Sequence, residues 1–505
     1  MTTYDLVVLG TGVGLTVIEE AVGRGLRCAL VEKDKFGGTC LTRGCIPSKV
    51  LTHPADLVRE AERAAKVGVS FPRTDLDWGR ISARMWNRIA QGEEMDRSLS
   101  AVPNLTIYRG TGEFTGDMRM RVKLNDASGY SEEFQGRRFV LATGARSVVP
   151  EIPGLEEIGY VTNETFFGEK FPERPWSSLA VIGGGILAAE FGHIFSAMGT
   201  KVTIMERGPR ILQTEEPETS ALAARIFSRH MDLHLNCHVG SVRPGPGGKK
   251  ILACEDRATG KRTDIEADEI LVAAGRRSNA DLLDAGKTGV TLDAEGWIET
   301  DGFLETAHPG IWAIGDAKGK LLFRHKANAD AELCIHNIFM TEHGKAPLDY
   351  SAVPWAVFSD PQIGHVGMTE AEAAAAGYDI LTALYHYSEV AKGFAMGYEP
   401  GDPEDGLVKL VVERSGKILG AHAAGPQAAL LVQPFVYLMN SGYACPPPAE
   451  KGNRILKQRV ACPEAGSVMP IYKSMVIHPS LNEVAAWALG ALHKPDKGQT
   501  GGPGI

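Results

Sequence analysis

The sequence predicts an α/β protein with two Rossmann-like dinucleotide-binding domains and a C-terminal α+β domain. Residues 4–34 and 178–208 share one pattern: a short apolar strand, a glycine turn, a helix, and a second apolar strand that ends in glutamate. In that context a glycine-rich turn indicates a dinucleotide site. From about residue 350, strand-like blocks alternate with helical blocks such as EAEAAAAG, which predicts a separate α+β domain.

Length and composition narrow the function classes. The chain has 505 residues, which predicts more than one domain, and its 58 glycines and 44% apolar content fit a loop-rich α/β enzyme. A net charge of −9 argues against a dominant nucleic-acid surface. No apolar run reaches the length of a membrane span, and MTTYDLVVLG lacks the basic start of a secretory signal. We therefore expect a cytoplasmic enzyme whose cysteines are reduced or catalytic.

The first glycine turn holds Gly10, Gly12 and Gly14. Gly10 permits a tight turn, and Gly12 lets backbone N–H groups approach a pyrophosphate at the start of the helix. Leu15 occupies the position of the usual third glycine, so we expect the packing of helix on strand to differ locally. Glu32 ends the second strand, where it can accept hydrogen bonds from adenosine ribose hydroxyls.

The second glycine turn holds Gly183 and Gly185, and Glu206 ends its second strand. A carboxylate at that position accepts from a free ribose 2′-hydroxyl and repels a 2′-phosphate, so it favours NAD(H) over NADP(H). Arg207 and Arg210 follow at once. They either attract a 2′-phosphate or lie on the surface as solvated charges.

The stretch GGTCLTRGCIPSK, residues 37–49, holds two nearby cysteines, Cys40 and Cys45. A disulfide between them requires the backbone to turn, which Gly44 permits. Pro47 is suited to the first turn of a helix, so Cys45 would lie at a helix N-terminus, where a thiolate is favoured. The spacing alone does not decide whether Cys40 and Cys45 form a disulfide or are two buried thiols. The interpretation as a zinc site has less support, because no second pair of ligands follows nearby, and we predict no metal site.

Three later motifs complete an order along the chain: LATG at 141–144, IGD at 314–316 and HPSLNE at 478–483. With the two glycine turns and the two-cysteine motif, this order resembles the pyridine nucleotide–disulfide oxidoreductases over about residues 4–493. The resemblance implies an FAD-binding domain, an NAD(P)-binding domain and a dimerisation domain.

The same resemblance places the domain boundaries. They are FAD-binding residues 1–150 and 276–348, NAD(P)-binding residues 151–275, a dimerisation domain at 349–493 and a flexible tail at 494–505. Residues 444–470 look like a loop insertion, with a triple proline and mixed charge. Cys445 and Cys462 flank it and are either a second exchange pair near the substrate entrance or incidental surface thiols. Cys28, Cys237, Cys254 and Cys334 have no visible partner in the sequence and are interpreted as packing residues.

The resemblance also implies the cofactors, FAD and a nicotinamide nucleotide. The residues expected to contact them are Gly10, Gly12, Gly14, Glu32, Lys33, Gly38, Thr39, Lys49, Thr143, Gly144, Gly183, Gly185, Glu206, Arg207, Gly275, Arg276, Gly315, Asp316, His325 and Ala327. Among these, Asp316 matches the aspartate that holds the ribityl chain, and His325 and Ala327 match a segment beside the flavin ring.

Catalytic roles are implied by position. Cys40 corresponds to the interchange thiol that faces the substrate, and Cys45 to the charge-transfer thiol against the flavin. Lys49 and Glu190 correspond to an ion pair near flavin N5, with one partner on the helix of the cysteines and the other on the helix of the second glycine turn.

His478 and Glu483 correspond to the acid–base pair of the family. Thiol–disulfide exchange needs a proton on the departing sulfur, and an imidazole can carry that proton near neutral pH. In the family this pair reaches the disulfide of the other subunit, so the resemblance implies a homodimer.

The resemblance leaves the substrate open. Glu206 and the SK ending of the cysteine motif favour an enzyme like dihydrolipoamide dehydrogenase, acting on a lipoyl group, and this is our leading prediction. The segments PNLTIY, AVFSDPQI and HPSLNEV favour the alternative, a reductase of another low-molecular-weight disulfide like mycothione reductase. A flavoprotein without turnover, acting as a redox sensor, is the alternative of another class. It would be expected to lose a cysteine or the base, and all of these residues are present.

Overall fold

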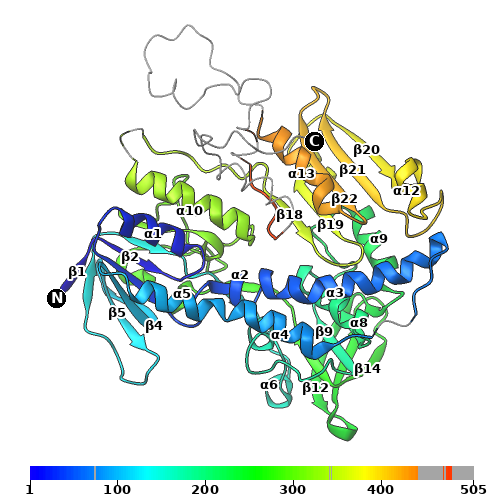
Figure 1. The fold of residues 1–505 in the computed structure, drawn as a ribbon, viewed down its shortest axis with the longest axis horizontal. Coiled ribbons are helices and arrows are strands. Elements are labelled where there is room, and N and C mark those ends of the chain that lie inside the picture. Colours follow the sequence, from blue (N-terminus) through cyan, green and yellow to red (C-terminus); the bar gives the residue numbers. More distant parts are fainter. Residues whose placement is uncertain (73–74, 341, 343, 442–469, 471–473, 480–505) are drawn as a thin grey trace, which may run out of the picture.

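The computed structural model of the chain describes residues 1–72, 75–340, 342, 344–441, 470 and 474–479. In Figure 1 the N-terminal sheet lies at the left and the C-terminal sheet at the upper right, with the second dinucleotide unit below. Helix α3 (Cys45–Arg63) runs across the molecule between these regions. It begins at Cys45, so the two-cysteine motif lies near the centre of the view.

The N-terminal sheet has eight strands in the order β1-β6-β5-β4-β3-β2-β7-β17. The strands are β1 (Thr2–Tyr4), β2 (Leu6–Leu9), β3 (Cys28–Glu32), β4 (Leu105–Gly116), β5 (Arg119–Leu124), β6 (Phe134–Gly136), β7 (Phe139–Leu141) and β17 (Ile311–Ala313). β4 pairs in parallel with β3 and then, further along, antiparallel with β5. β17 joins this sheet although its residues follow the second unit, so the sheet is built from two separated stretches of chain.

The second dinucleotide unit is a parallel sheet in the order β11-β10-β9-β15, beside an antiparallel sheet of β12, β13 and β14. Its elements are β9 (Ser178–Ile182), α8 (Ile186–Ala197), β10 (Lys201–Met205), α9 (Pro217–Phe227), β11 (Met231–His234), β12 (Cys237–Pro244), β13 (Lys250–Asp256), β14 (Arg262–Ala267) and β15 (Glu269–Val272). Phe166, Phe191 and Phe195 pack ring against ring in its core. Both predicted Rossmann-like units are therefore present.

Helices lie between and over these sheets. They are α1 (Gly14–Gly23), α2 (Gly38–Thr42), α3, α4 (Trp78–Ile89), α5 (Gln91–Ser100) and α10 (Arg324–Phe339). On α4, Trp78, Met85 and Ile89 are buried at a spacing that repeats on one helix face. Helix α4 is therefore amphipathic, with its apolar face turned inward.

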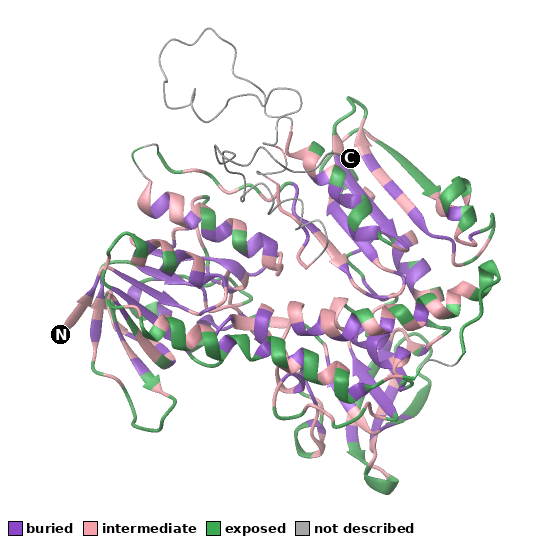
Figure 2. Cartoon of the chain, in the orientation of Figure 1, coloured by how far each residue is buried: buried purple, intermediate pink, exposed green. Residues whose placement is uncertain are grey.

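The C-terminal sheet has five antiparallel strands in the order β18-β19-β22-β21-β20. Its elements are β18 (Pro354–Val357), β19 (Ile363–Gly367), α11 (Glu370–Ala375), β20 (Ile380–His386), α12 (Ala391–Ala395), β21 (Leu407–Glu413), β22 (Ile418–Ala424) and α13 (Ala428–Met439). α13 packs on β19 and β22, which confirms the predicted α+β domain. The edge strand β20 is exposed along most of its length, as Figure 2 shows.

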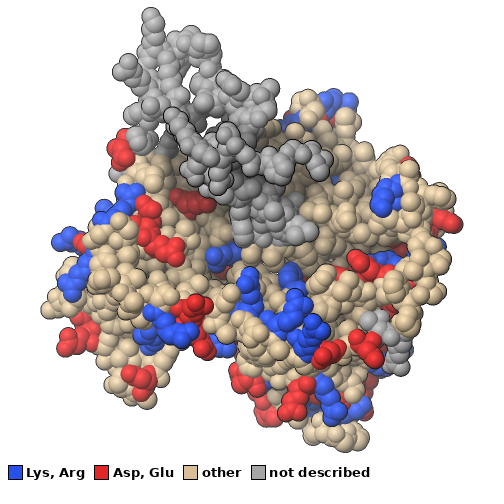
Figure 3. All heavy atoms as spheres, in the orientation of Figure 1, with Lys and Arg blue, Asp and Glu red and all other residues tan. Residues whose placement is uncertain are grey.

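The remaining elements are short. They are β8 (Ala145–Ser147), β16 (Arg276–Ser278), α6 (Leu155–Ile158) and α7 (Asn163–Phe166). None of the described helices is both long and apolar enough to cross a membrane. On the face seen in Figure 3, several Lys and Arg side chains gather near the centre, and Asp and Glu side chains are scattered around them. The insertion at 444–470, apart from residue 470, and the tail at 494–505 lie outside the described residues.

Candidate functional site

The first glycine turn makes contacts that side chains would block. Gly10 has a φ of +101°, and a Cβ there would lie 2.3 Å from the carbonyl oxygen of Ala142. Gly38 has a φ of +60°, and a Cβ there would lie 2.6 Å from the Cα of Gly12. These backbone contacts join the turn between β2 and α1 to the start of α2, which carries Cys40.

Gly14 supplies the close contact between helix and strand. It begins α1, and a Cβ there would lie 2.8 Å from Cγ1 of Val8. Leu15, at the position of the usual third glycine, is buried in the core instead. The local difference in packing that we predict is therefore present, with the close approach shifted by one residue.

Glu32 ends β3 and is buried beside the turn. Its Oε2 accepts hydrogen bonds from the backbone N–H of Thr11 at 2.8 Å and from the Thr11 hydroxyl at 2.6 Å. Its Oε1 accepts from the backbone N–H of Asp34 at 2.9 Å. A carboxylate has further lone pairs, so Glu32 can still accept from a ribose hydroxyl in the adjoining cleft.

A cleft runs from the glycine turn to the two cysteines. The expected cofactor residues that line it are Gly10, Gly12, Glu32, Lys33, Thr39, Thr143, Gly144, Arg276, Gly315, Asp316 and Ala327. Thr143 Oγ1 and Arg276 Nε are buried there without a hydrogen-bond partner among the described residues. Unpaired buried polar atoms cost free energy unless a ligand pairs with them. The cleft therefore fits a ligand with several polar groups, such as a dinucleotide.

Asp316 lies in a short 3-10 helix, η5 (Gly315–Lys318), at the wall of the cleft. Burial raises the pKa of its carboxyl group above the ordinary value, and the charges of Arg276 and Lys326 oppose that shift. A half-buried carboxyl at the wall is suited to accept hydrogen bonds from ligand hydroxyls, which fits the ribityl chain implied by the resemblance.

Several cleft residues are missed by sequence reasoning. Thr11, Asn279, Arg324 and the glycines of residues 110–112 line the same space. The signal for residues 110–112 is the tripeptide GTG, which repeats the first glycine turn at residues 10–12. Asn279 and Arg324 carry no comparable signal, because each lies in a loop or at a helix start with ordinary neighbours.

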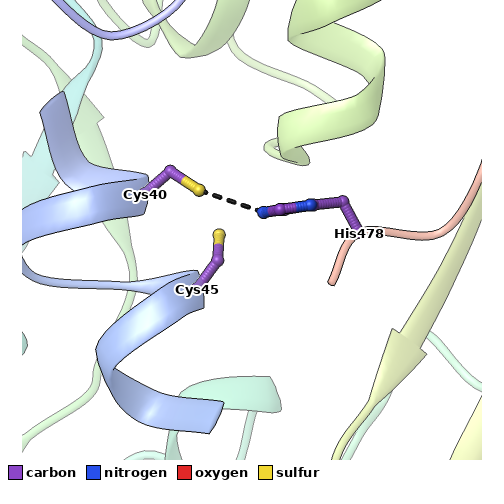
Figure 4. A group of neighbouring side chains, drawn as sticks. All are labelled: Cys40, Cys45 and His478. Carbon is purple, nitrogen blue, oxygen red and sulfur yellow. Dashed lines mark hydrogen bonds between the residues drawn. The ribbon is translucent and has the colours of Figure 1, made fainter. Parts of the chain in front are cut away.

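The short helix α2 and the first turn of the long helix α3 bring the cysteines together (Figure 4). Cys40 lies in α2 and Cys45 is the first residue of α3, so the predicted turn and helix start are confirmed. Between them the chain turns at Gly44, where a Cβ would lie 2.9 Å from the carbonyl oxygen of Thr39. Both sulfurs are present as half-buried thiols joined by a hydrogen bond.

The surroundings of Cys45 favour its thiolate. The hydrogen bond from Cys40 is the largest cause, and burial opposes it. The positive charges of Lys49 and His478 act in the same direction as the hydrogen bond, and together these groups lower the pKa of Cys45 to about 6. The two sulfurs and the imidazole nitrogen of His478 all lie within 4.8 Å of one another. Protons and sulfur bonds can therefore be exchanged among these three groups.

His478 brings an imidazole to Cys40. Its Nε2 lies 3.2 Å from the Cys40 sulfur, as Figure 4 shows. The preceding residue, Ile477, anchors the segment, because its backbone N–H donates to the side chain of Gln433 in α13 at 3.2 Å. The contact joins residues of one chain, whereas the resemblance implies the cysteines of a partner. Residues 442–469, which separate α13 from this segment, lie outside the described residues. Glu483 lies outside the described residues.

The expected ion pair of Lys49 and Glu190 is present, between α3 and α8. Lys49 Nζ lies 2.7 Å from Glu190 Oε2, and Glu190 Oε1 accepts from the backbone N–H of Phe358 at 3.1 Å. Lys49 also lies over the Phe358 ring, 4.6 Å from its centre. The pair therefore links the cysteine helix to the second dinucleotide unit and to the C-terminal domain.

The contact of His325 with a cofactor stays a prediction. His325 is absent from the lining of the cleft, although its neighbour Ala327 lines it. Its Nε2 donates to the carbonyl oxygen of Pro354 at 2.6 Å, and its Nδ1 accepts from the backbone N–H of His478 at 3.4 Å. Burial lowers the pKa of His325 to about 4, so the ring is neutral at neutral pH and can accept at Nδ1.

The second glycine turn lies away from the cysteine cleft. Gly183 has a φ of +115°, and Gly185 precedes α8. Glu206 follows β10, where its Oε1 accepts from the backbone N–H of Gly208 at 2.6 Å and from Gln213 at 2.9 Å. Arg207 is exposed. The carboxylate is thus fixed at the end of the strand, as a ribose contact requires.

Gly275, expected beside Arg276, adopts a φ of +126° just before β16.

Cys237 and Cys254 are packing residues, as the sequence suggests, and lie in one buried apolar cluster, but there they also meet each other. Cys237 and Cys254 lie on neighbouring strands, and their thiols hydrogen-bond to each other. The Cys254 sulfur also lies 3.5 Å from the sulfur of Met205. Residues on different strands meet through the register of the sheet, which spacing in the sequence does not reveal.

Comparisons with known proteins agree with this geometry. A family model described as pyridine nucleotide-disulphide oxidoreductase matches residues 4–331, and the model of its dimerisation domain matches residues 353–446. The chain is 35% identical over 452 residues to mycothione reductase of Mycobacterium tuberculosis, covering 88% of this chain and 94% of that protein. It is 31% identical over 439 residues to dihydrolipoyl dehydrogenase of Halobacterium salinarum, covering 85% of this chain and 89% of that protein. The HOCl-induced flavoprotein disulfide reductase RclA from Escherichia coli superposes with a TM-score of 0.74 at 25% identity, covering 97% of this chain and 100% of that one.

The environment of Cys45 predicts a titration that can be measured on the reduced protein. Because its pKa is lowered to about 6, the thiolate is the minor form below that pH and the main form at neutral pH. The rate of Cys45 alkylation by iodoacetamide, followed by peptide mass spectrometry, should therefore rise with pH around that midpoint. Lys49→Met should move the midpoint upward, since it removes a charge that stabilises the thiolate. Buried Cys334, whose pKa is raised by burial, serves as the unreactive reference.

Proposed function

The chain belongs to the pyridine nucleotide-disulphide oxidoreductase family, and from this premise we propose that it exchanges electrons between a nicotinamide nucleotide and a small disulfide or dithiol through Cys40 and Cys45. The observation that carries the proposal is the contact of Cys40 with His478 at 3.2 Å, beside a cysteine with a pKa of about 6. A nucleophilic sulfur, a proton carrier and a second sulfur are the groups that disulfide exchange needs.

The family depends on FAD, and the cleft beside the cysteines has the groups to hold it. When bound, FAD accepts an electron pair from the nicotinamide and delivers it to the redox disulfide. We propose that Glu32 and Asp316 accept hydrogen bonds from its hydroxyl groups. Thr143 Oγ1 and Arg276 Nε, which are otherwise unpaired, would donate to it.

The chain's own residues can carry out the exchange in two steps. The Cys40 thiolate attacks the substrate disulfide, forming a mixed disulfide, and His478 gives its proton to the departing sulfur. The Cys45 thiolate then attacks the Cys40 sulfur, which releases the second substrate thiol and leaves a Cys40–Cys45 disulfide. With a dithiol as substrate the same steps run in reverse, and His478 accepts the proton.

Two substrates are candidates. A low-molecular-weight disulfide of the mycothiol type is favoured by the 35% identity to mycothione reductase, against 31% for dihydrolipoyl dehydrogenase. Dihydrolipoamide is favoured by Glu206, since a lipoyl enzyme uses NAD(H). We place the low-molecular-weight disulfide first by this small margin, although the sequence alone favours the lipoyl group.

A panel of disulfides separates the two candidates. The reduced enzyme should turn over mycothiol disulfide with a higher kcat/KM than lipoamide, glutathione disulfide or coenzyme A disulfide. Dihydrolipoamide oxidation with NAD⁺ should be slower than the reduction of mycothiol disulfide. A higher kcat/KM with lipoamide would reverse the order of the candidates and leave the exchange mechanism in place.

The Cys45→Ser variant tests the mechanism itself. It keeps the cleft but removes the sulfur that resolves the mixed disulfide, so we expect disulfide turnover to fall by at least ~10³-fold. Reduction of an artificial electron acceptor by NADH should persist, because it bypasses the cysteines. Loss of both activities with the flavin still bound would contradict the assignment. Wild-type NADH oxidation without turnover of any disulfide would favour a redox sensor instead.

Glu206 predicts the choice of coenzyme. Under anaerobic conditions NADH should reduce the enzyme faster than NADPH at equal concentration, because the carboxylate repels a 2′-phosphate. Glu206→Ala removes that repulsion and should raise the NADPH to NADH ratio of kcat/KM about tenfold. Lys201→Ala is the matched control, since Lys201 is exposed at the opposite end of β10, and it should leave the NADH rate unchanged. An NADPH preference in the wild type would contradict the proposal.

We also propose a homodimer formed through the C-terminal domain. The family model that matches residues 353–446 is a dimerisation domain. Leu430, Leu431 and Leu438 of α13 are exposed at 37%, 40% and 56%, as a helix face that packs on a second copy would be.

A further inference from the structure

Two histidines and a glutamate meet on the face of the C-terminal sheet that is turned away from α13. His365 in β19 and His422 in β22 are paired directly across these neighbouring strands, so their side chains point to the same face. Glu215, which precedes α9 of the second dinucleotide unit, reaches the same place. The three side chains are at most 1% exposed. The group therefore joins the second dinucleotide unit to the C-terminal domain, away from the cofactor cleft.

Each histidine presents the same ring nitrogen to the group. Nε2 of His365 lies 3.0 Å from the carbonyl oxygen of Gly367, and Nε2 of His422 lies 3.1 Å from that of Met368. A carbonyl oxygen only accepts, so Nε2 carries a hydrogen on both rings. The two Nδ1 atoms, which lie 3.2 Å apart, are turned to each other. Histidines that bind a metal ion are arranged in this way, because their second ring nitrogen donates to a backbone carbonyl.

Three acceptor atoms converge in this buried place. Nδ1 of His365 lies 3.0 Å from Oε2 of Glu215, and one ligand atom from each of the three residues lies within 4.8 Å of the others. With both rings neutral, each of these atoms offers a lone pair. Lone pairs that face one another away from water repel, so a cation must lie among them, either a proton or a metal ion.

A single proton pairs with the group unevenly. Placed on Nδ1 of His365, it would be donated to Glu215 and would leave Nδ1 of His422 without a hydrogen of its own, and a buried acceptor without a donor costs free energy. A divalent ion binds all three lone pairs at once. Two ligand atoms that lie ~2.0–2.1 Å from a tetrahedral zinc ion are about 3.4 Å apart. The separations of 3.0 Å and 3.2 Å within the group are close to that value.

The charge of Glu215 also requires a cation within the group. Its neighbour Glu216 is paired with Lys409 at 3.0 Å, and Lys409 is shared with Glu218 at 2.9 Å. Among the residues that the structure describes, no lysine or arginine pairs with Glu215, whose ion-pair partner is His365. A buried carboxylate is stable only when its charge is compensated. A divalent ion supplies that charge while both histidines stay neutral.

Trp355 orients the carboxylate of Glu215. Its indole N–H donates to Oε1 at 2.7 Å, and its ring stacks on His365 with 3.5 Å between centres. Because Oε1 is occupied by this hydrogen bond, Oε2 is the oxygen that is turned to the histidines. Contacts of this kind are typical of metal sites, where they fix the direction of each ligand.

We propose that Glu215, His365 and His422 form a binding site for a divalent transition-metal ion of the Zn²⁺ type. Two imidazoles and one carboxylate are a ligand set that suits zinc, with the fourth position left to a water molecule. The ion fixes the start of α9 to β19 and β22, and so ties the second dinucleotide unit to the C-terminal sheet. The spacing of these residues in the sequence does not indicate the site, because its ligands come from three separate elements. The site is independent of the function proposed above.

Zinc binding by the flavin-loaded full chain, prepared without a histidine tag, tests this inference. After dialysis against a chelator, the protein should bind about one zinc ion per chain with a Kd below ~1 µM, measured by calorimetric titration and by mass spectrometry of the metal content. Glu215→Gln and His422→Gln should each weaken binding at least ~10-fold, and Trp355→Phe about tenfold. Glu218→Gln, which alters an acid bonded to Lys409 in the same helix, is the matched control and should bind zinc like the wild type.

Two further measurements locate the ion. A variant with both Cys40→Ser and Cys45→Ser should keep the tightly bound zinc, since no cysteine is a ligand. In crystals of the zinc-loaded protein, anomalous scattering at the zinc absorption edge should place the ion among the three side chains.

The inference is wrong if the wild type binds no zinc with this affinity, if Glu215→Gln and His422→Gln bind it as tightly as the wild type, or if the double cysteine variant loses it. In the first two cases the group shares a proton instead. None of these results alters the proposal for disulfide exchange. Should a variant fail to fold, the titration of the wild type and the anomalous scattering decide.

Discussion

The approach of Gly12 to Gly38 is the constraint on which the site depends. At this point the turn that follows the first strand touches the start of the first cysteine helix, and a single Cβ would separate them. The contact places Cys40 at the end of the cleft that begins at the turn. The same backbone geometry that leaves a phosphate site open therefore also sets how far the redox sulfurs lie from it. The approach requires a glycine at position 38, where a Cβ would lie 2.6 Å from the Cα of Gly12, whereas a Cβ on Gly12 would lie at an ordinary contact distance of 3.9 Å from the Cα of Gly38.

Around the sulfurs, charge is arranged so that one proton can move. Cys45 is favoured as a thiolate, and the buried ring of His325 is held neutral. Lys49 is held by Glu190 and adds positive charge from the side of α3. The site thus combines a lowered thiol pKa with a backbone-held imidazole, and each of these effects comes from a different element of the fold.

Most of the architecture is predictable from the sequence, for definite reasons. The two glycine turns lie between apolar strands, so Gly10 and Gly183 specify their units with local information alone. Cys45 at a helix start follows from Gly44 and Pro47 in the same way.

The features that cannot be predicted from the sequence are contacts between side chains that lie far apart in the chain. His325 appears as part of a cofactor segment, yet its ring turns to Pro354 and His478, which lie on other elements. Cys237 and Cys254 meet only through strand register, and the pairing of Glu215 with His365 joins two domains. Position in a motif predicts the backbone well, because turns are local. It predicts side-chain direction less well, since direction is decided by neighbours that are remote in the chain.

Strand β17 has a consequence for how the chain is made. It completes the N-terminal sheet beside β7, whose three residues are fully buried in the finished protein. On the ribosome, β7 emerges early and β17 only after the whole second unit has been synthesised. During that interval β7 is an open, apolar sheet edge, the kind of surface at which nascent chains pair wrongly. The second unit is thus inserted into the folding of the first, and the cofactor cleft cannot close until both have formed.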